Sequence, residues 1–286
     1  MHDALVAADA LDGHLEDPAW VVLDCRFRLD DPDHGERAYR AGHVPGARYA
    51  HLDRDLSGPV VPGATGRHPL PEPDALARTF GDWGIGEGTQ VVAYDDAGSA
   101  IAARVWWLLR WLGHEAVAVL DGGLPAWTAS GRPLAAGVEP PPSPRAFVPR
   151  PRSELVVDAA AVASALEADI RVLDVRSEDR FRGENETMDP IAGHIPGATS
   201  APFAGNLDRE GRFLPAADLR RRYEALLHAP VGAPAPGPIV YCGSGVTAAH
   251  AALAMRVAGL AQPRLYAGSW SEWINDPARP VATGPA

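Results

Sequence analysis

The sequence predicts an α/β protein of two tandem domains, each a mostly parallel sheet flanked by helices on both faces. Three observations lead to this prediction. A chain of 286 residues suits two domains. Short apolar runs typical of buried strands alternate with longer runs typical of helices, which favours parallel sheets covered by helices. The second half of the chain also repeats motifs of the first, so both halves are expected to share one fold.

The internal repeat is clearest in the motif Gly-His-aliphatic-Pro-Gly-Ala. It occupies residues 42–47 and returns at residues 193–198. Several matches at nearly the same separation indicate a tandem duplication rather than chance. The other matching pairs, like this one, lie 146 to 151 residues apart: Asp24 and Asp174, Asp95 and Cys242, Gly122 and Gly268.

The expected elements follow from periodicity and from turn residues. In the first half we expect a helix over 7–15, strands over 20–24, 90–94 and 117–120, and a tryptophan-rich core helix over 101–112. Residues 53–73 are rich in Gly and Pro and are expected to form a loop. In the second half we expect strands over 170–176 and 238–241 and a helix over 248–258.

The domain boundaries are expected at a proline-dense stretch near the middle of the chain. Such a stretch is stiff and extended, which suits a linker. We therefore predict a non-catalytic N-terminal domain over 1–135, a linker over 136–152, and a C-terminal domain over 153–286 that carries the reactive cysteine.

The charge balance argues against two classes of partner. The net charge is −11, from 26 basic and 37 acidic residues, whereas nucleic acids and anionic membrane surfaces attract basic patches. The uncharged run over 229–255 is interrupted by prolines and glycines, so it does not predict a membrane span. The start of the chain lacks the pattern of a secretion signal. We therefore expect a cytoplasmic protein with neither a nucleic-acid nor a membrane partner.

The two cysteines are expected to play different parts. They fall in different halves, which argues against a disulfide framework. Cys25 aligns with Val175 of the other half, so a buried apolar role is expected. His43 and His194 occur in both halves and are therefore expected to fix a turn of the fold. Cys242 aligns with Asp95, and this asymmetry singles it out for chemistry.

The loop over residues 242–247, Cys-Gly-Ser-Gly-Val-Thr, follows an expected strand and precedes an expected helix. Glycines let such a loop curl its N–H groups inward, and the start of the helix adds positive potential. Both effects favour an anion, and the natural anion is the Cys242 thiolate. The alternative is a small buried cysteine in a tight glycine turn.

The tandem halves, the paired Gly-His-x-Pro-Gly-Ala motifs and the lone cysteine loop resemble two-domain sulfurtransferases of the rhodanese superfamily. The loop itself is similar to that of 3-mercaptopyruvate sulfurtransferases. Thiosulfate sulfurtransferases carry basic residues after the cysteine, where this chain has Gly243 and Ser244.

The resemblance implies a role for several residues. Cys242 would be the nucleophile and carry sulfur as a persulfide, within a substrate cradle of Gly243, Gly245, Val246 and Thr247. Ser244 would relay a proton, assisted across the domain cleft by His68 and Asp53 of the first half. Arg180 would bind the substrate carboxylate. The alternatives are a solvated loop histidine for His68, a turn-capping carboxylate for Asp53 and a surface ion pair for Arg180.

The chain departs from the family where a second substrate arginine often follows the first. Residues 184–190 are acidic and contain no arginine. We therefore expect one charge-assisted contact to be missing and the KM for 3-mercaptopyruvate to be raised.

The expected function is transfer of a sulfane sulfur from 3-mercaptopyruvate through the Cys242 persulfide to a thiol, cyanide or a thioredoxin-like acceptor. No metal or organic cofactor is expected. The alternatives are a thiosulfate sulfurtransferase and a non-enzymatic persulfide carrier for a protein partner. A phosphatase is disfavoured, because Ala248 stands where an arginine would close a Cys-x₅-Arg loop.

Overall fold

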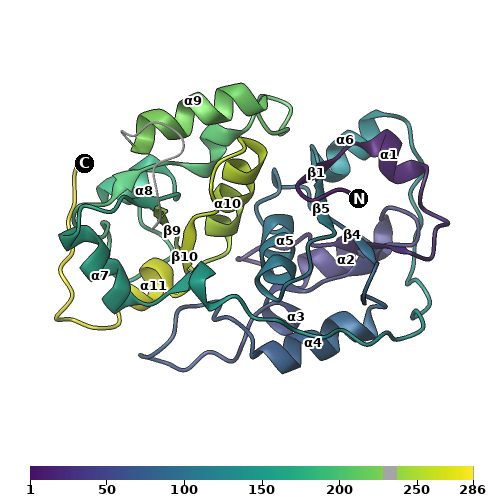
Figure 1. Ribbon diagram of the computed structural model, residues 1–286, viewed down its shortest axis with the longest axis horizontal. Coiled ribbons are helices and arrows are strands. Elements are labelled where there is room, and N and C mark those ends of the chain that lie inside the picture. The colour runs from purple at the N-terminus through teal and green to yellow at the C-terminus, as the bar shows by residue number, and fades with distance from the viewer. Residues whose placement is uncertain (228–236, 286) are drawn as a thin grey trace. The chain divides into compact units, whose positions relative to one another are not determined.

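The computed structural model describes residues 1–227 and 237–285, which form two compact units. The first unit comprises residues 1–58, 71–152 and 209–213. The second comprises residues 59–70, 153–208 and 214–286. Each unit contains its own sheet and its own buried core (Figure 1).

The first unit contains a five-stranded sheet in the order β1-β5-β4-β2-β3, in which all neighbouring strands are parallel. The strands are β1 (Leu5–Val6), β2 (Trp20–Asp24), β3 (Arg48–Tyr49), β4 (Gln90–Tyr94) and β5 (Val117–Leu120). The helices are α1 (Ala8–Asp12), α2 (His34–Ala41), α3 (Leu52–Asp55), α4 (Pro73–Asp82), α5 (Ala102–Trp111) and α6 (Gly123–Ala129).

The second unit repeats this topology, with a parallel sheet in the order β6-β10-β9-β7-β8. This correspondence confirms the predicted duplication and fold class. The strands are β6 (Val156–Val157), β7 (Val172–Asp174), β8 (Thr199–Ser200), β9 (Ile239–Tyr241) and β10 (Arg264–Tyr266). The helices are η1 (Ser153–Leu155), α7 (Ala159–Glu167), α8 (Glu178–Arg182), η2 (Phe203–Asn206), α9 (Ala216–Leu227), α10 (Thr247–Val257) and α11 (Ser269–Trp273).

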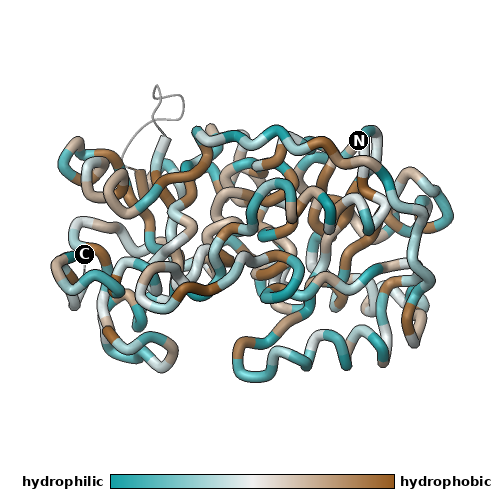
Figure 2. Tube along the Cα trace, turned by 90° about the horizontal axis from the view of Figure 1, so that it is seen from below, coloured by the Kyte–Doolittle hydropathy of each residue, from teal (hydrophilic) through white to brown (hydrophobic). Residues whose placement is uncertain are grey.

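The central strands are apolar because both of their faces are covered. Every residue of β4 and of β9 is buried, as expected for parallel strands between helices. Hydrophobic residues are frequent in the inner turns of the trace and hydrophilic residues in the outer loops (Figure 2). Helix α5 is buried along its whole length, including Trp106, Trp107 and Trp111, which confirms its predicted core role.

The Gly-His-aliphatic-Pro-Gly-Ala motif is anchored by a buried arginine in each unit. In the first, Arg26 pairs with Asp24 at 2.6 Å and donates to the carbonyl of Gly42 at 2.7 Å. In the second, Arg176 donates to the carbonyl of Gly193 at 2.6 Å. The same ties in both units explain why the motif survives in both halves of the sequence.

The motif histidines are also structural. Nδ1 of His43 lies 2.8 Å from the carbonyl oxygen of Tyr39, and Nδ1 of His194 lies 2.7 Å from that of Phe181. Both rings are buried, and each stacks on the aromatic ring of the residue whose carbonyl it faces, Tyr39 for His43 and Phe181 for His194. The predicted structural role of both histidines is confirmed.

Two segments pack differently from what their place in the sequence suggests. Residues 59–70 lie within the predicted N-terminal domain but belong to the second compact unit. Residues 136–152, expected as a linker, lie against the first unit: the N–H of Arg145 donates to Gly81 and that of Arg150 to Leu112, both at 2.9 Å. The start of the predicted loop over 53–73 is helical, because α3 extends to Asp55.

No described helix is long and apolar enough to cross a membrane. Residues 229–236, part of the uncharged run discussed above, lie outside the described residues.

Candidate active site

Cys242 lies at the carboxyl end of the central strand of the second sheet. Strand β9 ends at Tyr241 and α10 begins at Thr247, so residues 242–246 form the loop between them (Figure 1). In open α/β sheets, ligands bind outside the carboxyl ends of the strands. The predicted strand–loop–helix placement of the cysteine is confirmed. Cys242 is a free thiol and only 2% exposed.

The loop backbone faces the sulfur. The N–H of Gly245 donates to Sγ of Cys242 at 3.1 Å. Gly245 adopts a φ of +80°, and a Cβ atom there would lie 2.3 Å from the carbonyl oxygen of Ala267. Only glycine can therefore give the loop this curvature. The curvature turns an N–H group onto the sulfur and favours a negative charge there.

In the first unit the corresponding loop begins with an aspartate in place of the cysteine. Asp95 follows the central strand β4 as Cys242 follows β9, and it is buried. Its carboxylate accepts hydrogen bonds of 2.8–2.9 Å from the N–H groups of Ala97, Ser99, Ile101 and Ala102. Burial raises the pKa of Asp95 and these hydrogen bonds oppose the rise. In both halves the loop thus directs backbone N–H groups onto the side chain of its first residue.

We expect Asp95→Ala to lower the free energy of unfolding by about 3 kcal/mol, because it leaves four N–H groups without their acceptor, and those of Ser99 and Ala102 are buried. The corresponding fall in Tm is roughly 6–12 °C. Thermal unfolding followed by circular dichroism measures it. Asp96→Ala is the matched control, because Asp96 is exposed. A fall in Tm no larger than that of the control would contradict the cradle interpretation.

His68 and Ser244 are in contact. Nδ1 of His68 lies 2.7 Å from Oγ of Ser244, and the two residues are 4% and 6% exposed. The interpretation of His68 as a solvated loop histidine is therefore wrong. A histidine hydrogen-bonded to a hydroxyl two residues from the reactive thiol is an arrangement that can move a proton.

The segment that carries His68 is fixed to the second unit by hydrogen bonds on either side of Gly66. Nδ2 of Asn275 donates to the carbonyl of Thr65 at 3.0 Å, and the N–H of Arg67 donates to Oγ of Ser271 at 3.1 Å. A Cβ atom on Gly66 would lie 2.5 Å from the carbonyl oxygen of Gly268, so glycine is needed for this close approach.

Arg180, in the middle of α8, also lies beside the cysteine loop. A Cβ atom on Gly243 would lie 3.5 and 3.6 Å from its two terminal nitrogens. Nε of Arg180 donates to Glu186 at 3.0 Å and Nη2 to Asp189 at 2.9 Å. Both acidic side chains are 2% exposed, so Arg180 is not part of a surface ion pair.

The acidic stretch 184–190 therefore has a positioning role that the sequence did not suggest. Burial raises the pKa of Glu186, but hydrogen bonds from Arg180 and from backbone N–H groups outweigh burial and hold it below its usual value. Burial raises the pKa of Asp189, against the opposing effect of Arg67 and Arg180. The two carboxylates hold the guanidinium group of Arg180 by ion pairs.

A second arginine, Arg67, lies beside the loop, and the expectation of a missing contact to the donor stays a prediction. Arg67 pairs with Asp189, and its Nη2 would lie 3.1 Å from a Cβ atom on Gly243. Sequence reasoning missed Arg67 because it lies far from Arg180 in the chain. Its position next to His68 was the available signal. Arg182, by contrast, pairs with Glu178 and Glu184, which are both well exposed.

Ser269 is a further residue that the sequence did not suggest. Its Oγ accepts a hydrogen bond from the N–H of Cys242 at 3.1 Å and lies 4.0 Å from Sγ. The residue is fully buried and has a φ of +53°, which is uncommon for a residue other than glycine. Of the other predicted cradle residues, Val246 is buried and Thr247 half-buried at the start of α10.

Two predicted assignments concern the first unit. Asp53 is exposed in the first turn of α3, and its role in a proton relay stays a prediction. Cys25 is fully buried, and burial, followed by the nearby carboxylates of Asp95 and Asp24, raises the pKa of its thiol well above the usual value. The predicted buried role of Cys25 is confirmed.

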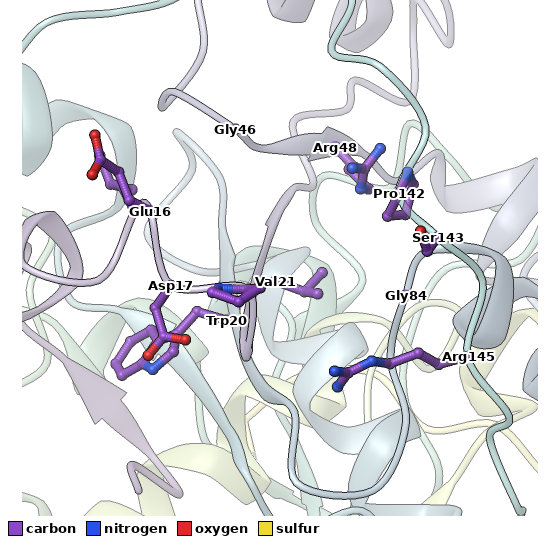
Figure 3. Close-up of a pocket in the computed structure, with 12 residues that line it drawn as sticks. Glu16, Asp17, Trp20, Val21, Gly46, Arg48, Gly84, Pro142, Ser143 and Arg145 are labelled. Atoms are coloured by element: carbon purple, nitrogen blue, oxygen red, sulfur yellow. The ribbon is translucent and has the colours of Figure 1, made fainter.

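A metal cluster and a pocket of the first unit can be compared with the cysteine loop. In residues 1–227 and 237–285 no group of three or more His, Cys, Asp or Glu residues could hold a metal ion. A pocket of about 330 Å³ in the first unit is bordered by Glu16, Asp17, Arg48 and Arg145 (Figure 3). The described residues that line it include no cysteine or histidine, so it offers neither a thiol nor an imidazole.

Comparisons with known proteins agree with this geometry. The profile of the rhodanese-like domain matches twice, at residues 7–130 and 158–276. A probable 3-mercaptopyruvate sulfurtransferase of Pseudomonas aeruginosa is 52% identical over 98% of both chains. A putative thiosulfate sulfurtransferase, SseB of Mycobacterium tuberculosis, is 41% identical over 99% of this chain and 98% of its own. The solved 3-mercaptopyruvate sulfotransferase SseA of Escherichia coli has a TM-score of 0.80 at 32% identity, covering 95% of this chain and 100% of its own.

Proposed function

The chain belongs to the rhodanese-like family and is a sulfurtransferase, and from that premise we propose that it moves sulfur from 3-mercaptopyruvate through a persulfide on Cys242 to a thiol or cyanide. The observation that carries the proposal is the contact of His68 with Ser244, two residues after a cysteine whose sulfur accepts a backbone hydrogen bond. The catalytic half is the C-terminal domain, with His68 supplied by residues 59–70.

The first half-reaction begins when the Cys242 thiolate attacks the sulfur of the donor. A sulfur–sulfur bond forms, the carbon–sulfur bond breaks, and its electron pair passes to the carbon fragment as the enolate of pyruvate. That carbon then takes a proton. Ser244 can deliver the proton while His68, 2.7 Å away, replaces it. Asp53 orients His68 in this proposal.

The second half-reaction regenerates the enzyme. The acceptor, as a thiolate or as cyanide, attacks the outer sulfur of the persulfide. The sulfur–sulfur bond breaks and Cys242 leaves as a thiolate. The N–H of Gly245 stabilises the anionic sulfur in both half-reactions. The scheme is a ping-pong exchange carried by the chain's own residues.

The charges beside the loop favour a monoanionic donor over thiosulfate. Two guanidinium groups, of Arg67 and Arg180, lie beside Gly243, but the carboxylates of Glu186 and Asp189 offset their charge. A compact dianion gains little net attraction there, whereas a planar carboxylate can make directed bonds to a guanidinium group. Thiosulfate remains the second candidate, because a 41% identical relative is named for it.

Steady-state rates for 3-mercaptopyruvate and thiosulfate, measured side by side with cyanide as acceptor, test the proposal. One well-made charge-assisted contact is worth about 1.5–3 kcal/mol, so we expect kcat/KM to be about 10-fold or more higher for 3-mercaptopyruvate. A higher kcat/KM for thiosulfate would overturn the choice of donor. Formation of one persulfide without multiple turnover would instead favour a persulfide carrier.

The proposal also covers the sulfur acceptor and the cellular compartment. A thioredoxin-like protein is a suitable thiol acceptor, because it presents a nucleophilic cysteine at neutral pH. We place the protein in the cytoplasm, where thiols stay reduced and Cys25 and Cys242 remain free.

A further inference from the structure

Ser271, in helix α11, bonds both to the cysteine loop and to the segment that carries His68. Its backbone N–H donates to the carbonyl of Gly243 at 2.9 Å. Its Oγ accepts a hydrogen bond from the backbone N–H of Arg67 at 3.1 Å, and the residue is 8% exposed. One small buried residue therefore joins the residue after Cys242 to the residue before His68.

Asn275, shortly after the end of α11, holds the same segment at a second point. Its Nδ2 donates to the carbonyl of Thr65 at 3.0 Å. Between the two bonds lies Gly66, where a Cβ atom would be 2.9 Å from Oγ of Ser271. The backbone that leads into His68 is therefore bonded on both sides of a glycine that is in close contact with Ser271.

The helix after the last core strand binds the strand–helix loop in both units, which places the two helices in register. In the first unit the N–H of Leu124 in α6 donates to the carbonyl of Asp95 at 2.9 Å. In the second the N–H of Trp270 in α11 donates to that of Cys242, also at 2.9 Å. Positions 124 and 270 lie 146 residues apart, the same separation as Gly122 and Gly268.

The residues that follow in this register differ between the units. Pro125 stands where the second unit has Ser271. Proline has no N–H and no polar side chain, so it can make neither of the two bonds. Ala129 likewise stands where the second unit has Asn275. These two polar side chains therefore occur only in the half that carries the reactive cysteine, which indicates a role in its chemistry rather than in the shared fold.

We propose that Ser271 and Asn275 are positioning residues that set the distance between His68 and Ser244. This inference rests on the proposed function, in which His68 and Ser244 deliver a proton to the carbon of the donor. Proton transfer needs groups within hydrogen-bond reach, and a misplacement of about 1 Å can cost about 100-fold in rate. Both positioning residues act through the backbone of residues 65–67.

The test measures pyruvate formation in a single turnover at saturating 3-mercaptopyruvate. Ser271→Ala removes the acceptor for the N–H of Arg67. Asn275→Asp keeps the size of the side chain but removes the donor to Thr65. We expect each variant to form pyruvate about 10-fold more slowly, a smaller loss than removal of His68 causes, because the relay is misaligned but still present.

Ser130→Ala is the matched control. It removes a hydroxyl group that donates to the carbonyl of Trp127 at 2.6 Å, just after α6 in the first unit. The rate of pyruvate formation in this variant should stay within about 2-fold of the original. A loss as large as that of Ser271→Ala would show that deletion of any such hydroxyl slows the reaction, and would contradict the proposal.

Two further measurements separate positioning from general support of the site. Sulfur transfer from a persulfide preformed with polysulfide to dithiothreitol places no proton on carbon, so Ser271→Ala and Asn275→Asp should leave that rate within about 3-fold of the original. Added to His68→Ala, Ser271→Ala should slow pyruvate formation no further, because it acts through the ring already removed. Equal losses in both half-reactions, or a further loss in the double variant, would overturn the proposal.

The outcomes distinguish this inference from the proposed function. If the unmodified protein forms pyruvate and both variants form it at the original rate, the inference alone fails. If the unmodified protein does not turn over 3-mercaptopyruvate, the proposed function fails. Crystal structures of the unmodified protein and of Ser271→Ala then still decide the inference: a longer distance from Nδ1 of His68 to Oγ of Ser244 would support it, and an unchanged 2.7 Å would overturn it.

Discussion

Replacing Cys242 by serine is expected to abolish turnover, lowering kcat by about 10⁴-fold or more. A hydroxyl group is protonated at neutral pH and cannot carry the transferred sulfur as a persulfide does. The fold should persist, because serine is close in size and the hydrogen bond from the N–H of Cys242 to Ser269 involves only the backbone of residue 242. Sulfur transfer to cyanide measures the loss, and circular dichroism checks the fold.

Cys25→Ala is the matched control for this variant. Cys25 is fully buried, and burial raises the pKa of its thiol and so disfavours the thiolate, the form that attacks the donor. After incubation with donor and no acceptor, the intact mass of the unmodified protein should rise by a single sulfur. Cys25→Ala should gain the same sulfur and Cys242→Ser none. Sulfur on the peptide that contains Cys25 would refute the assignment of all chemistry to Cys242.

Replacing His68 by alanine is expected to lower kcat for pyruvate formation by about 100-fold or more, which is the usual range for a lost proton-transfer group. Ser244→Ala should have a similar effect, because Nδ1 of His68 and Oγ of Ser244 form one hydrogen bond at 2.7 Å. Rapid-quench measurement of pyruvate in a single turnover isolates the step.

The double variant is the control for this pair. If the two side chains act as one relay, the effects of His68→Ala and Ser244→Ala should not add, and the double variant should be about as slow as the slower single variant. An undiminished kcat in His68→Ala, or fully additive effects, would show that the contact is structural and that the proton comes from elsewhere.

The sequence predicted the fold in considerable detail because parallel strands covered on both faces are continuous apolar runs. The predicted ranges for β2, β4 and β5 agree with the structure at both ends. The duplication also separated structural residues from the reactive one. A motif present in both halves indicates a structural role, as His43 and His194 have. The position where Cys242 replaces Asp95 indicates a function that only the second half has.

Within the site, the sequence identified two kinds of residue: those that lie on the cysteine loop itself, and those whose motif resembles that of a known family. Cys242, Gly245 and Ser244 lie on one loop between a strand and a helix, so their proximity follows from the chain itself. His68 and Arg180 came from the family resemblance, and the structure brings both beside that loop. A single sequence contained no independent geometric reason for either contact.

By itself, then, the sequence determined the duplicated α/β architecture and the reactive cysteine, because both depend on periodic burial and on local backbone conformation. Only the tertiary structure decided which charges surround that cysteine. Arg67 meets Asp189 and Gly243 because residues 59–70 pack on the second unit. Ion pairs between such distant segments follow no periodicity, so the acidic stretch 184–190 suggested a missing contact when its carboxylates in fact position two arginines.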